Sequence, residues 1–179
     1  ASSLVLMSDI KGGGAHTIHR HSTNGVAMHL DKSHICAHTY PDIVPGGEVC
    51  SFRVDIDIAT CGEISPLNAL NYMFKSFETD VVVIDYVVRG FTRDENGSRV
   101  YMDHPLRSIQ DYISNDVLNQ YDAIDLALQS DNIWQTKMLR TNMHESEYFI
   151  DNVMTNEERA PYISKIKKEM RGVLYMWPE

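Results

Sequence analysis

The stretch VCSFRVDIDIA, residues 49–59, is the clearest strand in the chain. Its side chains alternate between apolar and polar, which is typical of a strand with one buried face. The apolar face carries Cys50, Phe52, Val54, Ile56 and Ile58, and the other carries Ser51, Arg53, Asp55 and Asp57. We therefore expect the fold to contain a β-sheet built around this strand.

A second alternating segment lies just upstream, at residues 34–40. One side carries His34, Cys36, His38 and Tyr40, and the other carries Ile35, Ala37 and Thr39. The intervening PDIVPGGE, residues 41–48, holds two prolines and two glycines and is typical of a turn. The two segments therefore predict a β-hairpin. Further upstream, SLVLMS (residues 3–8) reads as a short strand and residues 11–25 as a loop.

Helical and strand patterns follow downstream. Ser65 followed by Pro66 is a helix start. The helix is expected to present a core-facing stripe formed by Leu67, Leu70, Phe74 and Phe77. Residues 80–103 predict a second hairpin that turns at Asn96-Gly97. Beyond it, residues 106–121 look helical, residues 122–129 are ambiguous, and residues 156–175 predict a closing helix with Pro161 near its start.

These elements define the fold class. Strands joined mostly by hairpins predict an α+β fold, in which an antiparallel sheet is covered by helices on one face. The 179 residues suffice for one hydrophobic core, and the sequence has neither an internal repeat nor a linker. We therefore expect residues 1–179 to form a single domain.

Composition excludes several classes of protein. Sixteen Lys and Arg against 25 Asp and Glu give a net charge of -9 without a basic cluster, so no nucleic-acid partner is expected. The first apolar run is four residues long, too short for a signal sequence or a membrane span. Three cysteines without a CxxC pair predict free thiols in a reducing compartment, and hence a cytoplasmic protein. The absence of an initiator methionine favours a chain that begins inside a longer gene product.

Histidines in the predicted loop 11–25 raise the question of a metal. His16, His19 and His21 are close in sequence, but nothing nearby completes the closed ligand set of a structural zinc site. A histidine-rich polar loop is the simpler interpretation, and no metal site is predicted.

Candidate chemistry is concentrated in DKSHICAHTYPD, residues 31–42. By composition alone, Ser33 is a turn or cap residue before a strand. The specific alternative is that its hydroxyl attacks the carbonyl of the Lys32–Ser33 peptide bond and forms an ester. β-Elimination of that ester would cut the chain and leave a dehydroalanine that hydrolyses to a pyruvoyl group. This chemistry needs a bent peptide bond and a nearby base.

Two further side chains are candidates for the same chemistry. His38 is the candidate base, but it is five residues from Ser33 and would face the opposite side of a regular strand. A turn or bulge at Ser33, with residues 22–33 as a loop, would bring the two together. Cys61 lies between the strand 49–59 and the Ser65 helix start. A thiol there is either buried filler or an exposed proton donor.

Three blocks of sequence carry a resemblance to a known family. They are HLDKSHICAHTYPD from His29, FRVDIDIATCGEISPLNALNYM from Phe52 and DVVVIDYVVRGFTRDENG from Asp80. In this order and spacing they closely resemble the pyruvoyl-dependent S-adenosylmethionine decarboxylases, in particular the longer bacterial form. The similarity runs from Val26 to KKEMRGVLY near the C-terminus. It implies the α/β sandwich of that family.

The resemblance also implies roles for individual residues. The Lys32–Ser33 bond matches the autocleavage site, and Ser33 becomes the pyruvoyl cofactor. His38 matches the processing histidine, and Cys61 in the TCG motif matches the catalytic cysteine. The pyruvoyl carbonyl is expected to form a Schiff base with the substrate amine and to accept electrons as CO2 leaves, after which Cys61 protonates the carbanion. Mg2+ is a candidate activator.

The implied reaction is decarboxylation of S-adenosylmethionine, which supplies the aminopropyl donor for spermidine synthesis. Two alternatives stay open: the same machinery acting on ornithine or arginine, and a non-catalytic relative that binds a partner or a metal through its histidines. Only 32 residues precede Ser33, whereas the longer bacterial form has a much longer upstream segment. Glu63, beside Cys61, is a candidate contact for a substrate cation or a solvated loop acid.

Cleavage would leave a β chain of residues 1–32 and an α chain of residues 33–179. The apolar row of strand 49–59 and the VVVIDYVV segment offer more apolar surface than one layer of helices covers. Together with the resemblance, this predicts at least a homodimer of αβ units.

Overall fold

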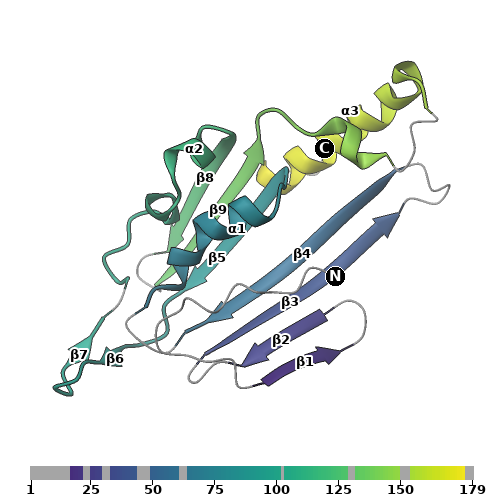
Figure 1. Cartoon of the computed structure of the whole chain (residues 1–179). Helices are drawn as coiled ribbons and strands as arrows, with labels where there is room; N and C mark the ends of the chain where they lie inside the picture. Colours follow the sequence, from purple (N-terminus) through teal and green to yellow (C-terminus); the bar gives the residue numbers. More distant parts are fainter. Residues whose placement is uncertain are drawn as a thin grey trace.

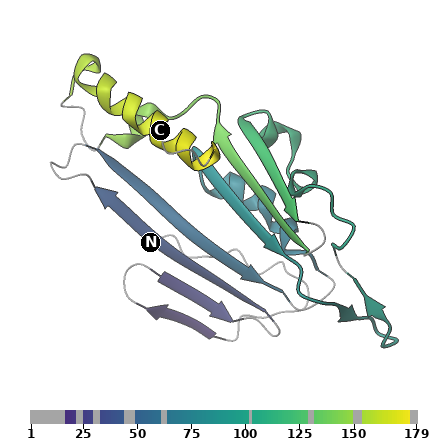
Figure 2. The same ribbon diagram turned by 180° about the vertical axis from the view of Figure 1, so that it is seen from behind.

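The computed structural model describes residues 17–21, 25–29, 33–43, 49–60, 64–101, 103–128, 132–149 and 154–175. Within these ranges the chain forms antiparallel sheets and a few helices, so the expected α+β class is confirmed. Two larger sheets lie beside each other, and the labelled helices gather at the second sheet (Figures 1 and 2). The strand predicted at residues 3–8 lies outside the described residues.

The first sheet is an antiparallel meander in the order β1-β2-β3-β4. Its strands are β1 (Thr17–His21), β2 (Gly25–His29), β3 (His34–Ile43) and β4 (Cys50–Ala59). β3 and β4 form the predicted hairpin. The loop prediction for residues 11–25 and 22–33 is wrong at β1 and β2. These short segments have only weak strand patterns of their own. They form strands because β2 pairs with the backbone of β3, and β1 pairs with the backbone of β2.

Alternation gives the first sheet two different faces, because directly paired residues share a face. Met28 and Ile35 are buried on one face, and Ile56 and Ile58 pack around them. The opposite face is polar and carries His34, Cys36 and His38 of β3 together with Asp55 and Asp57 of β4. The predicted distribution of side chains along β3 and β4 is therefore confirmed.

The second sheet has the order β5-β9-β8, formed by β5 (Val81–Val87), β9 (Ile133–Arg140) and β8 (Tyr121–Leu128). The predicted hairpin within residues 80–103 is only partly confirmed. The chain does turn at Gly97, where φ is 80°, but the turn joins two-residue strands, β6 (Thr92–Arg93) and β7 (Arg99–Val100). β5 pairs with β9 instead, because the apolar side chains of β5 pack there in the buried core around Trp134 and Met138 of β9.

Short helices cover one face of the second sheet: η1 (Pro66–Ala69), α1 (Leu70–Ser76), η2 (Ile109–Tyr112) and α2 (Asn115–Leu118). The Ser65 cap is confirmed, since its Oγ accepts a hydrogen bond from the Leu67 N–H at 3.3 Å. Two four-residue helices replace the longer helix expected within residues 106–121. The ambiguous residues 122–129 fall mainly in β8.

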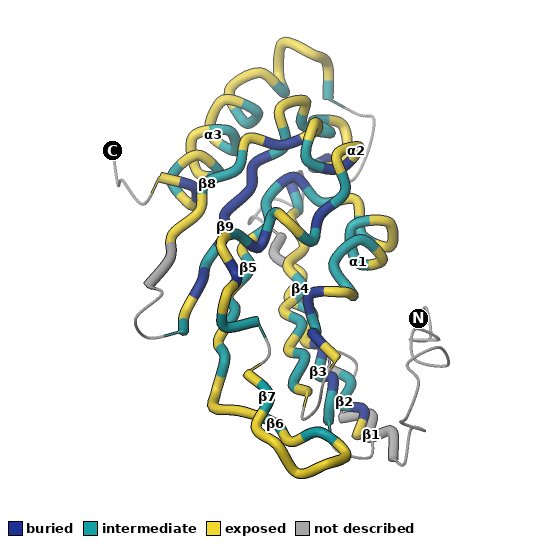
Figure 3. Tube along the Cα trace, turned by 90° about the vertical axis from the view of Figure 1, so that its left-hand side faces the viewer, coloured by how far each residue is buried: buried dark blue, intermediate teal, exposed yellow. Residues whose placement is uncertain are grey.

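A long C-terminal helix, α3 (Asn156–Tyr175), follows the short η4 (Glu145–Tyr148) and confirms the closing helix. Thr155 and Glu158 form a reciprocal cap at its start. α3 contacts the other face of the second sheet, where Lys137 Nζ donates to the Val173 carbonyl at 3.3 Å. The expectation that helices cover only one face is therefore wrong, because β9 is buried on both sides (Figure 3). No described helix is long and apolar enough to cross a membrane.

Candidate active site

The β3–β4 register brings the predicted processing residues to one end of the first sheet. His34 pairs with Ala59, so extending the register by one residue sets Ser33 opposite Thr60. Ser33 is partly exposed there. In the sequence Lys32 precedes Ser33 and Cys61 follows Thr60, but Lys32, Cys61 and Glu63 lie outside the described residues. Ser33 and Thr60, the first residue of the TCG motif, are distant in sequence and thus lie at the same end of the β3–β4 hairpin.

His38 lies further along the same strand. β3 pairs with β4 without a bulge from His34 to Ile43, so His38 is about 13 Å beyond His34 at the usual strand rise. It sits opposite Asp55, whose carboxylate is bound by the Arg53 Nε at 3.0 Å. The structure therefore does not bring His38 to Ser33 within one strand, as the predicted turn or bulge was expected to do.

His34 is the described histidine that directly adjoins Ser33. Its Nε2 lies 3.5 Å from Asp57 Oδ2, with 40% and 76% of the two side chains exposed. His29 pairs directly with His34 from β2. Sequence reasoning placed His34 and Asp57 on strands but gave neither a role. Their pairing depends on the register between β3 and β4, which the alternation alone does not fix.

A second polar cluster lies where η1 begins. The Tyr86 hydroxyl donates to Asp103 Oδ2 at 2.5 Å, and the Tyr112 hydroxyl donates to Asp103 Oδ1 at 3.0 Å. The pKa of both phenols is raised, first by burial and then by the hydrogen bond to Asp103. The hydroxyl of Ser65 interacts with both phenols and opposes that shift. No local pattern in the sequence indicates this cluster, since its members come from four separate segments.

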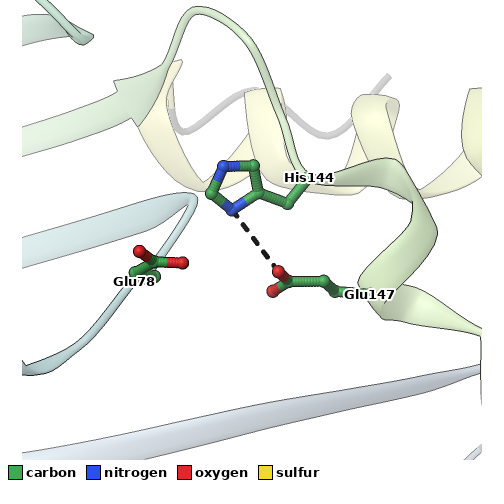
Figure 4. A group of neighbouring side chains, drawn as sticks. All are labelled: Glu78, His144 and Glu147. Carbon is green, nitrogen blue, oxygen red and sulfur yellow. Dashed lines mark ion pairs between the residues drawn. The ribbon is translucent and has the colours of Figure 1, made fainter.

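A third cluster raises the question of a metal ion. Figure 4 shows Glu78, His144 and Glu147 converging from two segments, and their ligand atoms lie within 4.8 Å of one another. However, Arg140 Nη1 lies 2.9 Å from His144 Nε2, and a guanidinium can only donate. A neutral His144 therefore carries its proton on Nδ1, the atom that faces Glu147 at 3.8 Å. Because that nitrogen has no lone pair to offer, these side chains do not fit the expected activator Mg2+ or another cation as they stand.

A pocket between the end of β9 and α3 is lined by neither Ser33 nor His38. Its lining includes Arg140, Lys167 and Arg171. Lys167 is paired with Glu145, and Arg140 with Asp80, so two of these three cations already have carboxylate partners.

Comparison with known proteins assigns the chain to a protein family. The family model described as S-adenosylmethionine decarboxylase matches residues 9–90. S-adenosylmethionine decarboxylase proenzyme of Clostridium perfringens strain SM101 is 47% identical over 150 residues, which cover 82% of this chain and 55% of the relative. The proenzyme of Buchnera aphidicola subsp. Acyrthosiphon pisum strain Tuc7 is 44% identical, over 86% of this chain and 59% of its own length. That of Klebsiella pneumoniae subsp. pneumoniae is 47% identical, with coverage of 84% and 58%.

The chain belongs to the S-adenosylmethionine decarboxylase family. It spans 55–59% of the length of these curated relatives. No solved structure matches it significantly.

Proposed function

We propose that the chain is the self-processing part of a pyruvoyl-dependent S-adenosylmethionine decarboxylase, with cleavage at Lys32–Ser33. The observation that carries the proposal is the 44–47% identity to curated proenzymes over more than four fifths of the chain. The β3–β4 register supports it, because Ser33 lies at the end of the hairpin that leads into Cys61. Cleavage gives the β chain 1–32 and the α chain 33–179.

Self-processing uses the chain's own groups. The Ser33 Oγ attacks the Lys32 carbonyl carbon as the C–N bond breaks, and a base then removes the Ser33 α-proton. Lys32 leaves as a carboxylate, and water converts the dehydroalanine to a pyruvoyl group with loss of ammonia. A histidine of β3 is the proposed base. His38 has the family match in its favour, and His34 has its position next to Ser33.

Two variants separate these histidines. His38→Gln and His34→Gln should be compared by the rate at which intact mass gives way to two chains. A base is expected to contribute about 10²-fold or more to the rate. The larger loss identifies the base, and equal wild-type rates in both variants would exclude a β3 histidine.

Decarboxylation needs an electron sink, which the pyruvoyl group supplies once formed. Cys61 is proposed to deliver the proton that replaces CO2 on the substrate carbon. Glu63 is proposed to meet the positive charge of the substrate. S-adenosylmethionine is the proposed substrate because the named relatives act on it. A cytoplasmic location and activation by Mg2+ remain predictions.

Two measurements test the function. Wild type should split into two chains with a keto group at the new N-terminus, whereas Ser33→Ala should stay whole and inactive. Release of labelled CO2 should then be compared for S-adenosylmethionine, ornithine and arginine at equal concentrations. A wild-type chain that folds but stays intact would contradict the processing, and a higher kcat/KM for a diamino acid would contradict the substrate.

The sandwich and the homodimer are further parts of the proposal. Phe52 is 65% exposed on the apolar face of β4. On the α3 side of the second sheet, Val83, Val87 and Ile133 are each more than one third exposed. A second copy covering these apolar side chains would add the buried area that one chain lacks.

A further inference from the structure

The pocket between the end of β9 and α3 has the size of a small-molecule site. Its volume is about 560 Å³, within the range of about 300–1,000 Å³ that is usual for such sites. Lys167, Arg171 and Tyr175 form one wall, since residues four apart lie on the same face of a helix. The remaining lining comes from Asp122 of β8, from the end of β9 and from the residues that follow β9.

Both walls of the pocket are held in place by the second sheet. Lys137 Nζ of β9 donates to the Val173 carbonyl and so ties the last turn of α3 to the sheet. On the other wall, the Thr141 N–H donates to the Gln120 carbonyl at 3.0 Å, and the Thr141 hydroxyl donates to the same carbonyl at 3.2 Å. The pocket is therefore formed before a ligand arrives, which lowers the free-energy cost of binding one.

Two charged side chains of the lining lack a partner. Lys167 and Arg140 each have a carboxylate partner, and Glu145 is the partner of Lys167. Among the residues that the structure describes, none forms a hydrogen bond or an ion pair with the Arg171 guanidinium or the Asp122 carboxylate. These two groups line one pocket without pairing with each other. The pocket therefore presents one positive and one negative charge to whatever occupies it.

A ligand that satisfies both groups must itself carry charges of both signs. A guanidinium binds a carboxylate through two parallel hydrogen bonds, and a carboxylate accepts hydrogen bonds from an ammonium group. A simple anion would leave Asp122 without a partner, and a simple cation would leave Arg171 without one. An α-amino acid carries both charges on a single carbon. Leu139, Met143 and Tyr175 add apolar surface that the side chain of an amino acid can contact.

We propose that this pocket binds an α-amino acid with an apolar side chain, whose carboxylate is held by Arg171 and whose ammonium group is held by Asp122. The site is additional to the proposed decarboxylase function, since neither Ser33 nor His38 lines it. Figures 1 and 2 show that β9 ends beside α3, whereas β3, the strand that follows Ser33, begins at the opposite end of the molecule. Binding in the pocket therefore needs no pyruvoyl group.

Isothermal titration calorimetry with L-leucine tests the chemistry of the ligand. An amino acid of this size should bind with a Kd of about 1 mM or lower. N-acetyl-L-leucine lacks the ammonium group and L-leucinamide lacks the carboxylate. Each should bind at least about tenfold more weakly, because it leaves one charged side chain of the pocket without its hydrogen bonds. Glycine should also bind about tenfold more weakly, because it has no apolar side chain to bury.

Variants of the two charged side chains test the location of the site. Arg171→Gln and Asp122→Asn should each raise the Kd for L-leucine at least about tenfold. Both side chains are exposed, so the variants should fold as wild type does. Arg89→Gln is the matched control, because Arg89 is also exposed but does not line the pocket. It should leave the Kd unchanged.

The same titration of Ser33→Ala separates the pocket from a pyruvoyl group, which could also take up an amine. This variant should bind L-leucine with the wild-type Kd, because it has no pyruvoyl carbonyl with which to form a Schiff base. Any of three results would overturn the inference: no binding of L-leucine to wild type at about 10 mM, loss of binding in Ser33→Ala, or an unchanged Kd in both pocket variants. A single-charge analogue that binds as tightly as L-leucine would overturn it too. Wild type that neither splits nor releases CO2 would contradict the proposed function and leave the binding result intact.

Discussion

Replacing Asp80 by alanine should be among the most destabilising single changes in the second sheet. The Asp80 side chain is 5% exposed and lies just before β5. It accepts a hydrogen bond from the Tyr148 hydroxyl at 2.7 Å, lies 3.3 Å from the His144 backbone N and is 3.7 Å from Arg140 Nε. One carboxylate therefore ties β5 to the end of β9 and to η4.

The magnitude follows from what the change leaves behind. Arg140 is 13% exposed, and removing one partner of a buried ion pair costs about 3–5 kcal/mol. Arg140 keeps its contacts with Tyr121 and His144, which favours the lower end. The Tyr148 hydroxyl keeps only the weak acceptor Met170 Sδ, at 3.6 Å, in place of the carboxylate, which adds about 1 kcal/mol. We expect a loss of about 4 kcal/mol, or roughly 10 °C in Tm for a chain of this size.

The assay is thermal and urea unfolding followed by near-UV circular dichroism. Asp122→Ala, at an exposed carboxylate on β8, is the matched control and should change stability by less than about 0.5 kcal/mol. A double-mutant cycle with Tyr148→Phe should give a coupling of about 1.5 kcal/mol or more. A loss below about 1 kcal/mol in Asp80→Ala would refute the reasoning, because the buried pair would then contribute no more than a surface pair.

Three further outcomes are expected. Cys61→Ala should process at least in part but lose most of its decarboxylase activity or transfer the amine to the pyruvoyl carbon, and full activity would mean that another group delivers the proton. Light scattering at micromolar concentration should give at least a dimer of αβ units, and a clean monomer would mean that the apolar faces are covered within one chain. The free energy of unfolding should fall as pH rises above 10.0, the ordinary pKa of tyrosine. In the unfolded chain the Tyr148 phenol then ionises, whereas in the folded state burial and Asp80 raise its pKa and keep it protonated. Tyr148→Phe should flatten that alkaline loss, and an unchanged slope would contradict the assignment.

Local signals in the sequence predicted the local parts of the fold. The Ser65–Pro66 start, the turn at Gly97 and the helix of residues 156–175 depend on neighbouring residues alone, and all three are confirmed. The hairpin of β3 and β4 was predictable because two alternating segments are separated by a short turn.

Long-range pairing was beyond such reasoning. β5 was expected to pair with the strand that follows it, but its partner β9 lies beyond two short helices and β8. The buried core around Trp134 and Met138 decides which strand pairs with β5, and no local pattern encodes that choice.

In the candidate site, too, some residues could be predicted from local sequence and others could not. Ser33, Lys32 and Cys61 came from motif and resemblance, and the β3–β4 register sets Ser33 at the hairpin end from which the sequence runs into Cys61. The contact between His34 and Asp57 and the cluster around Asp103 needed the register and the tertiary fold. His38, Cys61 and Glu63 keep their roles as predictions.

The position of Ser33 between two paired strands has a consequence for refolding. β2 and β3 are neighbours in the ladder, from Gly25 opposite His38 to His29 opposite His34. A cut at Lys32–Ser33 would leave β1 and β2 attached to the sheet only by ladder hydrogen bonds and side-chain contacts. Folding of the intact chain is unimolecular, whereas recovery of the cut protein from denaturant would require two chains to meet and so depend on concentration. The mature protein would then rely on slow unfolding for its persistence, since its two chains could drift apart once the sheet opened.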